Sequence, residues 1–259
     1  MESEKSTRKP PKRIRKIVLF VLLSLAVMFY VGDWIWYRSG TNEWKLERDR
    51  SGIKIWTLKA PGSRITKIKL HMQLKSKLAS MIKLIEDPAS GPDVGAKEVN
   101  MLEMKVSQSG DFRAYYECKI DLPFPFKDRQ SVILILHSQD TISKTIEMNV
   151  LAAPNKLPPD DSYVRPTHMH NIWYLTPLEN GVLDIEYYQD SDIGGSVPYF
   201  VNNVIATEAL FQLFSKFQHF MNLGKFKNAK FDYVKEFEMS YSAANGGDDK
   251  SSMNAQTTN

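Results

Sequence analysis

Residues 190–203, DSDIGGSVPYFVNN, hold the residue types of a metal or phosphate site. Asp190 and Asp192 share one face if they lie on a strand, and two carboxylates can bind a divalent cation. Gly194 and Gly195 follow, and glycine lets the backbone turn sharply or approach a phosphate. A metal-nucleotide site needs a nucleotide-binding α/β frame around these carboxylates, and the sequence shows none. We therefore predict that this stretch is a turn from a strand into a helix, with Gly194 and Gly195 as its hinge.

Two histidines and one cysteine are the other candidates for chemistry. His168 and His170 have a spacing that can begin a metal site, but they lie on the strand face opposite the predicted core, so we predict a solvated pair. Cys118 is the only cysteine, which excludes a disulfide within the chain. The sequence has no nucleophile elbow, zinc-protease motif, P-loop or dinucleotide-binding motif. We predict no catalytic residue, no metal and no cofactor.

The basic residues are concentrated at the N-terminus. Residues 1–16 hold seven of the 34 basic residues and two of the 30 acidic ones, so residues 17–259 carry 27 basic and 28 acidic side chains. A nearly neutral body without a basic stripe argues against nucleic acid as a partner, because such binding depends on phosphate neutralisation.

The segment IVLFVLLSLAVMFYVGDWIWY, residues 17–37, predicts a transmembrane anchor. As a helix it would be about 31 Å long, enough for a hydrocarbon core of about 30 Å. Aromatic residues between Tyr30 and Tyr37 are typical of the membrane interface. A cleaved signal peptide and a buried helix are the alternatives. No small-residue cleavage site follows the apolar run, and no polar face is present.

The basic flank predicts the orientation of the anchor. Residues 1–16 are expected in the cytoplasm, with the body on the opposite side of the membrane. A bacterial inner membrane with the domain in the periplasm is the preferred location, and the lumen of a eukaryotic organelle is the alternative. Only residues 38–44 separate the anchor from the body, which must therefore lie close to the bilayer. We predict a domain over 44–238 and a disordered tail over 239–259.

Hydrophobic periodicity in the body predicts an antiparallel α+β domain. A helix with Ser76 as its N-cap is expected over 76–88, and a long helix over 198–222 begins at Pro198 with Ser196 as a candidate cap. Asn180-Gly181 predicts a hairpin. The predicted strands are 52–60, 64–74, 98–107, 111–121, 130–139, 144–152, 167–176 and 181–190.

A curved antiparallel sheet wrapped around the long C-terminal helix satisfies this order of elements. Strand alternation then predicts which side chains face the helix. This inner set is apolar and rich in Met and aromatic residues, and it is typical of an ordinary core as well as of an apolar ligand cavity with a few polar groups. The candidate cavity residues are Leu102, Met104, Tyr116, Cys118, Met148, Asn171, Trp173, Ile185, Tyr187, Phe200, Val204, Thr207 and Phe211.

Two phenylalanines lie on a proline-bracketed loop, PFPFK, at residues 123–127. Phe124 and Phe126 are candidates to enter the bilayer or to gate the mouth of a cavity. Packing of both rings on the core is the alternative.

The order of elements and two motifs resemble the START lipid-transfer domains of the Bet v 1-like helix-grip superfamily. One motif is DLPFPFKDRQSVILI (121–135), a Pro-containing loop and a basic-acidic pair that open a strand. The other is Asp192 to Pro198, followed by Asn202 or Asn203, at the start of the last helix. The likeness covers residues 44–235. It implies a helix-grip fold that binds one apolar ligand, such as a sterol or phospholipid, between sheet and helix.

The chain departs from the sterol-binding members in one respect. Those members carry an arginine a few residues into the strand, and 131–134, Ser-Val-Ile-Leu, has none. The resemblance predicts a membrane-anchored lipid-binding or lipid-transfer protein whose partners are a lipid and the membrane. A lipid-sensing adaptor that acts through a protein partner is one alternative. An enzyme on an apolar substrate is less favoured, because no ionisable residue is predicted on the inner face.

Overall fold

The computed structural model describes residues 11–195, 197 and 199–236. The predicted tail, most of the predicted basic segment and the candidate cap Ser196 lie outside the described residues.

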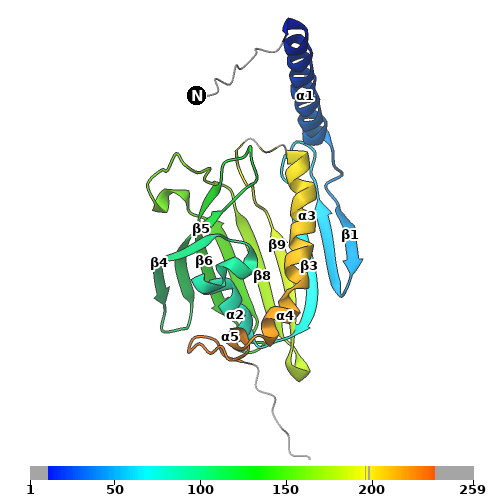
Figure 1. Cartoon of the computed structure of the whole chain (residues 1–259). Coiled ribbons are helices and arrows are strands. Elements are labelled where there is room, and N and C mark those ends of the chain that lie inside the picture. Colours follow the sequence, from blue (N-terminus) through cyan, green and yellow to red (C-terminus); the bar gives the residue numbers. More distant parts are fainter. Residues whose placement is uncertain (1–10, 196, 198, 237–259) are drawn as a thin grey trace, which may run out of the picture.

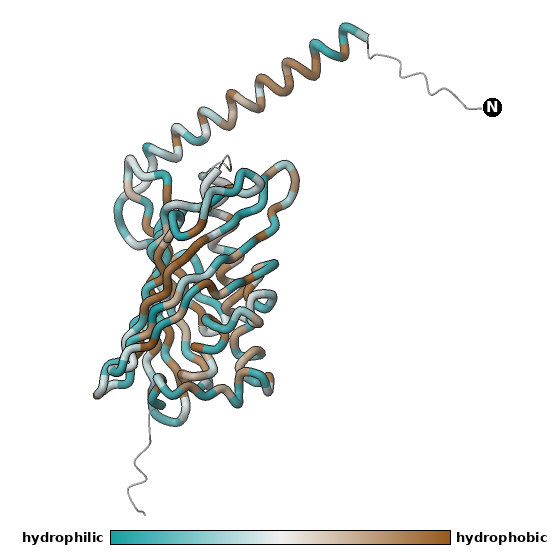
Figure 2. The backbone as a smooth tube through the Cα atoms, turned by 90° about the vertical axis from the view of Figure 1, so that its left-hand side faces the viewer, coloured by the Kyte–Doolittle hydropathy of each residue, from teal (hydrophilic) through white to brown (hydrophobic). Residues whose placement is uncertain are grey.

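The chain begins with an apolar helix that projects from the domain. α1 (Lys12–Arg38) has 27 residues, and none of them is buried. Its length of about 40 Å exceeds the thickness of a hydrocarbon core. Figures 1 and 2 show this helix extending away from the sheet, with its hydrophobic residues along most of its length. The prediction of one apolar helix of membrane-span length is confirmed.

The body is a nine-stranded sheet in which every neighbouring pair is antiparallel (Figure 1). Short connections join most neighbours, and only the β3–β9 pair brings distant segments of the chain together. In spatial order the strands are β1 (Trp44–Arg50), β2 (Ile53–Leu58), β3 (Lys67–Lys75), β9 (Val182–Gln189), β8 (His170–Pro177), β7 (Ile146–Ala152), β6 (Arg129–Gln139), β5 (Phe112–Ile120) and β4 (Glu98–Val106).

The register confirms most of the predicted strand faces. Tyr116 lies opposite Ile133, and Trp173 lies opposite both Met148 and Tyr187, so these side chains share the inner face, which faces the helices of the body. The predicted hairpin is also present. Asn180 and Gly181 both have positive φ, as the two central residues of a tight hairpin turn require.

The predicted face of Leu102 is wrong because β4 contains a bulge. Met101 pairs with Tyr116 and Glu103 with Tyr115, which leaves Leu102 as the extra residue. Met101 therefore takes the inner position that simple alternation assigned to Leu102. Leu102 itself is exposed.

The sequence analysis missed β1, which runs through residues 44–50, WKLERDR. This strand is an edge of the sheet, is exposed at most positions and contains a bulge between Leu46 and Arg48. Its five charged residues give no apolar alternation. Edge strands with charges and bulges are common because they resist pairing with a second sheet.

The helices of the body lie on the inner face of the sheet. The prediction of one continuous helix over 198–222 is wrong, because the helix breaks near Lys216. The hydroxyl of Ser215 donates to the carbonyl of Phe211 at 2.6 Å, a back-bond that often bends helices. The helices are α2 (Leu78–Glu86), α3 (Tyr199–Ser215), α4 (Phe217–Asn222) and α5 (Gly224–Lys227), and short 3-10 turns lie at Pro88–Val94, Pro154–Lys156 and Glu179–Gly181.

The core lies between the inner face and these helices. Leu70, Ile185 and Met148 are fully buried on the sheet side, and Phe214 and Phe217 are buried on the helix side. The aromatic rings pack closely, with Phe214 and Phe217 centroids 4.5 Å apart. A sheet that is apolar on this face requires such a cover.

The N-terminus of α2 is capped by a residue that is distant in sequence. The carboxylate of Glu236 accepts hydrogen bonds from the backbone N–H groups of Leu78 and Ala79, at 3.0 and 2.9 Å. The predicted cap Ser76 is wrong, since its hydroxyl donates to the carbonyl of Lys77. The helix begins one residue later than that cap requires, with Lys77 at the N-cap position.

We expect Glu236→Ala to lower the free energy of unfolding by about 1–2 kcal/mol, because two N–H groups at a helix N-terminus lose an anionic acceptor. Chemical denaturation of the full chain measures this change. Ser76→Ala is the matched control and should stay within about 0.5 kcal/mol of the parent. Equal effects of the two substitutions would contradict the assignment of the cap.

Candidate functional site

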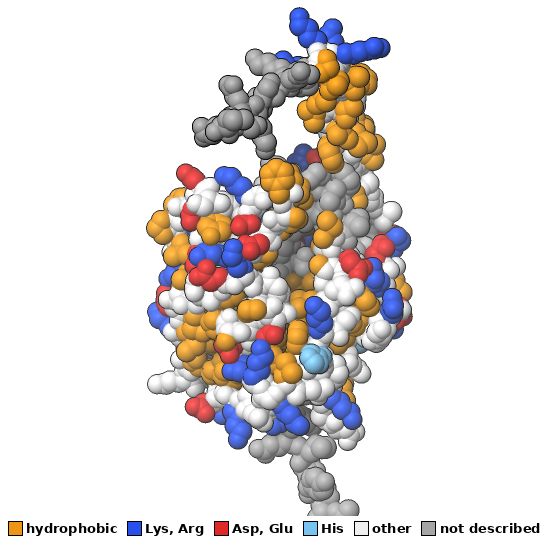
Figure 3. Space-filling view, viewed as in Figure 1, with side chains coloured by type: hydrophobic (Ala, Val, Ile, Leu, Met, Phe, Trp, Pro, Cys, Tyr) orange, Lys and Arg blue, Asp and Glu red, His pale blue; other side chains and the backbone are white. Residues whose placement is uncertain are grey.

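The helices leave part of the inner face uncovered. α3 lies over the side of the sheet formed by β1, β2 and β3, where Glu208 forms an ion pair with Arg48 of β1. α2 and α5 lie at the end of the sheet opposite α1 (Figure 1). Figure 3 shows a hollow between α3 and the β4–β6 half of the sheet, with hydrophobic side chains at its rim. We call this hollow the groove.

The side chains at the groove are apolar and only half-buried. Cys118 of β5, Ile133 of β6, Trp173 of β8 and Met169, which immediately precedes β8, are half-buried on the inner side of the sheet, and all pack against the core. Apolar surface left in contact with water costs roughly 25 cal/mol per Å² relative to burial. Burial raises the pKa of the Cys118 thiol to about 11, so this cysteine is a small apolar group rather than a nucleophile.

The candidate cavity residues separate into three groups. Cys118, Asn171, Trp173 and Thr207 are half-buried, and Leu102 and Met104 are exposed. The side chains of Phe200 and Val204 lie outside the described residues. The fully buried members are Tyr116, Met148, Ile185, Tyr187 and Phe211.

The polar atoms of two of these residues already have partners. The side-chain oxygen (Oδ1) of Asn171 accepts from the Asp190 N–H at 3.2 Å and from the Ser191 hydroxyl at 2.5 Å. The Tyr187 hydroxyl donates to Gln189 at 3.1 Å. These bonds hold the end of β9. Because both protein groups already have hydrogen-bond partners within the chain, neither needs a ligand to supply one.

The sequence analysis missed two ionisable residues on the inner face. Arg129 and His137 lie at opposite ends of β6, and both pair with inward-facing residues of β5. The prediction that the inner face has no ionisable residue is therefore wrong. β6 is apolar on both faces over VILIL, 132–136, so alternation could not assign its faces.

Arg129 holds the stretch in which the two aspartates lie. Its side chain is 1% exposed, and its guanidinium donates to the carbonyl oxygens of Ile193 at 2.9 Å and Gly194 at 2.8 Å, and also to that of Lys127. Burial lowers the pKa of Arg129, but a guanidinium stays charged at physiological pH. A buried cation with three carbonyl partners fixes residues 193–194 against the start of β6.

The two aspartates have structural partners. The carboxylate of Asp192 accepts from the Gly194 N–H at 2.8 Å and from the Tyr199 hydroxyl at 2.9 Å, which joins the turn to the first residue of α3. Asp190 contacts Lys67 and His168, each at 2.8 Å. Burial acts to raise the pKa of Asp190, but its hydrogen bonds outweigh this and lower the pKa below its ordinary value.

The predicted histidine pair does not converge. His168 contacts Asp190, while His170 lies 3.1 Å from the side-chain oxygen of Asn149. Among the residues that the structure describes, no three His, Cys, Asp or Glu side chains form a cluster suited to a metal.

Gly194 and Gly195 are required by their backbone dihedrals, and Gly195 also by the lack of room for a side chain. Gly194 and Gly195 have φ of 71° and 75°, in the left-handed region. A Cβ at Gly195 would lie 3.1 Å from an Arg129 Nη atom and 3.4 Å from the side chain of Val164. The turn therefore packs directly on the buried arginine.

A second set of contacts joins the end of α1 to the start of α3. Arg64 lies 3.3 Å from the carboxylate of Asp33 in α1, and its guanidinium stands over the rings of Tyr37 and Tyr199. The backbone carbonyl of Arg64 accepts from the Asn203 side chain at 3.2 Å. The end of the apolar helix and the first turn of α3 are thus held by the same residue.

The proline-bracketed loop lies at the α1 end of the domain, since it leads into β6 at Arg129. Phe124 is 97% exposed, whereas Phe126 is half-buried. The alternative that both rings pack on the core is therefore wrong for Phe124. Asp128 holds the loop by accepting from the Leu122 N–H at 3.0 Å.

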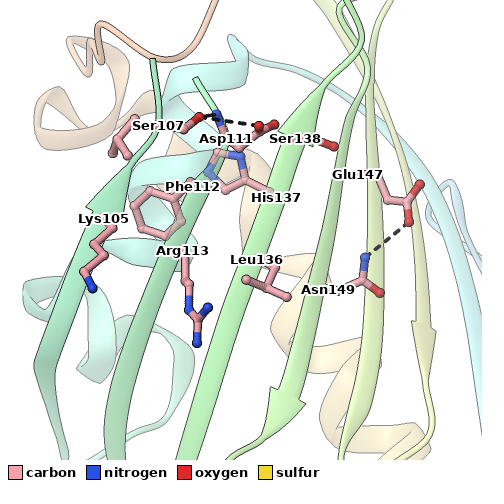
Figure 4. Close-up of a pocket in the computed structure, with 11 residues that line it drawn as sticks. Lys105, Ser107, Asp111, Phe112, Arg113, Leu136, His137, Ser138, Glu147 and Asn149 are labelled. Carbon is pink, nitrogen blue, oxygen red and sulfur yellow. Dashed lines mark hydrogen bonds between the residues drawn. The ribbon is translucent and has the colours of Figure 1, made fainter. Parts of the chain in front are cut away.

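An open depression of about 770 Å³ lies on the outer face of β4–β7 (Figure 4). Arg113, Leu136 and Asn149 lie opposite one another across it, and Asn149 donates to Glu147 at 3.2 Å. Most of its lining residues are polar, and Lys105, Arg113 and Asp111 among them are exposed to solvent. Figure 4 also shows Phe112 and His137 side by side on neighbouring strands.

Sequence comparison finds a relative of this chain but no family model. No family model matches the sequence. An uncharacterised protein of Pseudomonas aeruginosa is 25% identical over 197 residues, which cover 76% of this chain and 93% of that protein.

Solved structures give a closer description. A StAR-related lipid transfer protein of Xanthomonas axonopodis matches with a TM-score of 0.61 and 21% identity over 70% of this chain and 99% of that chain. Human StAR-related lipid transfer protein 5 matches with a TM-score of 0.58 and 15% identity over 76% of this chain and 95% of that chain. The chain has the START fold, and the resemblance stated from its motifs is confirmed at the level of the fold.

We expect Gly195→Ala to lower the free energy of unfolding more than Gly181→Ala does. Both positions have similar positive φ, so each substitution should cost about 1 kcal/mol in backbone strain. Gly181 has no atom near its Cβ position, whereas a methyl group at Gly195 must displace Arg129 or Val164. We expect at least about 1 kcal/mol more destabilisation at Gly195, measured by chemical denaturation. If the two substitutions lower the free energy of unfolding equally, the Arg129 side chain moves aside without cost and the prediction is wrong.

Proposed function

We propose that this protein is a membrane-anchored lipid-binding protein that holds one apolar ligand in the groove between α3 and the sheet. The observation that carries the proposal is the half-exposed apolar lining of the groove, with Cys118, Ile133, Met169 and Trp173 facing the helices. A ligand that removes this surface from water gains the transfer free energy of both apolar surfaces, less the cost of ordering. The START fold of the chain supports the same reading.

We infer that α1 holds the domain against the bilayer with the groove near the membrane. Five residues, 39–43, separate α1 from β1, and the Gly62 N–H donates to the Tyr37 carbonyl at 2.8 Å. Phe124 lies at the same end of the domain and is suited to enter the lipid interface. The basic flank favours a cytoplasmic N-terminus, with the domain in the periplasm of a bacterial cell.

Ligand exchange would require α3 or the loop 122–128 to move. The pivot of such a movement would be Gly194 and Gly195, and it would require the hydrogen bonds of Arg129 to the carbonyls of Ile193 and Gly194 to break. Transfer would then be limited to the reach of an anchored domain, to a nearby membrane or to a soluble carrier. A transfer protein and a lipid sensor both bind lipid. They differ in whether the bound lipid is exchanged with a second membrane.

The groove predicts the effect of bulk at Cys118. We expect the full chain, released from lipid nanodiscs into a mass spectrometer, to retain about one lipid molecule. Cys118→Trp should reduce retention at least about tenfold, because an indole fills the space beside Ile133. Cys118→Ser is the matched control and should retain lipid as the parent does. If the Trp variant folds and retains as much lipid as the parent, the groove is not the binding site.

The anchor predicts how the chain fractionates. We expect the full chain to stay in the membrane pellet after alkaline carbonate extraction. Lysine at both Val21 and Leu25, near the middle of α1, should release it, since each charge costs about 2.5–3.5 kcal/mol at the centre of a membrane helix. Lysine at the exposed Leu178 is the control and should change nothing. A parent chain found in the supernatant would rule out the anchor, and protease added outside the membrane tests the orientation.

A further inference from the structure

A cluster of buried polar side chains lies at the end of the inner face farthest from α1. Glu86 ends α2, His137 lies near the end of β6, and Tyr116 lies in β5. All three are at most 5% exposed. Tyr233 closes the cluster from the C-terminal segment, and its hydroxyl donates to Glu86 at 3.0 Å. Neither the fold nor the groove requires ionisable groups at this depth.

The hydrogen bonding of this cluster is incomplete. Among the described residues, the Tyr116 hydroxyl and the Nδ1 atom of His137 have no hydrogen-bond partner. His137 Nε2 and Glu86 Oε1 lie 2.8 Å apart and are paired with each other. His137 is held in this orientation by stacking on Phe112, with ring centroids 4.7 Å apart. Buried polar groups without partners are rare and costly.

A small pocket reaches this cluster. It has a volume of about 200 Å³, and Glu86 and Tyr233 line it together with Phe112, Met101 and Phe231. This volume is below the range of roughly 300–1,000 Å³ for a whole ligand, so the pocket is suited to one end of a longer molecule. Tyr116 lies between the pocket and the groove in the sheet, since it pairs with Met101, which lines the pocket, and is followed on the same face by Cys118.

We propose that Glu86, His137 and Tyr116 bind the polar end of the ligand, and that this end is an uncharged hydroxyl group. This inference rests on the proposed lipid-binding function of the groove. A hydroxyl accepts one hydrogen bond, from Tyr116, and donates one, to His137 Nδ1 or to Glu86, so it supplies both missing roles. The apolar body of the ligand then lies along Cys118 and Ile133, toward α1.

Two other lipid head groups fit the cluster less well. A phosphate has acceptors but no donor for Glu86, and it would face that carboxylate. The only described cation lining the pocket is Lys83, which pairs with Asp87 at 2.7 Å. A quaternary ammonium suits the aromatic rings and the carboxylate, but it has no hydrogen-bonding atom and leaves Tyr116 unpartnered. Burial and then the charge of Glu86 raise the pKa of Tyr116, which keeps its hydroxyl protonated as a donor.

The test compares four probes that share one octadecyl chain. The delipidated full chain is reconstituted in nanodiscs, and binding is measured by displacement of radiolabelled octadecanol. We expect octadecanol to bind at least about tenfold more tightly than methyl octadecyl ether, octadecyl phosphate or octadecyltrimethylammonium. A tenfold change in affinity corresponds to about 1.4 kcal/mol.

Two variants assign the preference to the cluster. Glu86→Gln should weaken octadecanol binding about tenfold and leave binding of the ether unchanged, because the ether has no donor. Tyr116→Phe should weaken binding of both, because the ether oxygen also accepts from Tyr116. Tyr174→Phe, on the outer face of β8, is the matched control and should bind as the parent does. Tyr116→Phe keeps the shape of the side chain and removes an unpartnered hydroxyl, so its thermal unfolding midpoint should not fall.

The outcomes separate this inference from the proposed function. Equal binding of all four probes, a preference for the phosphate or the ammonium, or unchanged octadecanol binding by a folded Tyr116→Phe variant would each overturn the hydroxyl site and leave lipid binding intact. Failure to bind every probe, by a chain that also carries no lipid from its own membrane, would overturn both.

Discussion

The sheet has more apolar inner face than its helices cover, and the rest of the structure depends on this mismatch. Six neighbouring strands present one continuous apolar face from Ile55 in β2 to Ile135 in β6. α3 shields the side near β2 and β3, and α2, α5 and the C-terminal segment shield the end far from α1. What remains is the strip along Cys118, Ile133 and Trp173. An apolar strip that is only half-buried is unfavourable in water and favourable against an apolar ligand, which is the basis of its proposed use.

Arg129 stands at one end of this strip, and Glu86, His137 and Tyr116 stand at the other. At the α1 end, Arg129 satisfies its charge with backbone carbonyls of the turn before α3, and it thereby fixes where the helix starts. At the opposite end, the Tyr116 hydroxyl and His137 Nδ1 have no partner among the described residues. The contrast is informative, because both ends are deeply buried. One charge is fully used by the architecture, and the other groups are left available to a ligand.

The sequence predicted the fold wherever alternation or turn chemistry was strong. Strand faces followed from side-chain period along β5, β7, β8 and β9, and Asn180-Gly181 marked a hairpin. The errors have physical causes. The bulge at Leu102 shifts the register, and the charged edge strand β1 gives no periodic signal. Glu236 caps α2 from 158 residues away, which no local rule detects. Arg129 and His137 were missed because β6 is apolar on both faces, and Val132 on its outer side is buried near the loop that begins at Pro154.

Both edge strands of the sheet carry a bulge, at Leu46–Arg48 in β1 and at Met101–Glu103 in β4. The proposed anchor would hold the domain on a membrane by one short connection, so that the edges of adjacent copies would face one another in two dimensions and at high local density. Two regular edges would then pair into a ribbon of strands that runs from one molecule to the next. The bulges, together with the charges of β1, interrupt the backbone ladder at both edges. The sheet can therefore be crowded at a bilayer without polymerising.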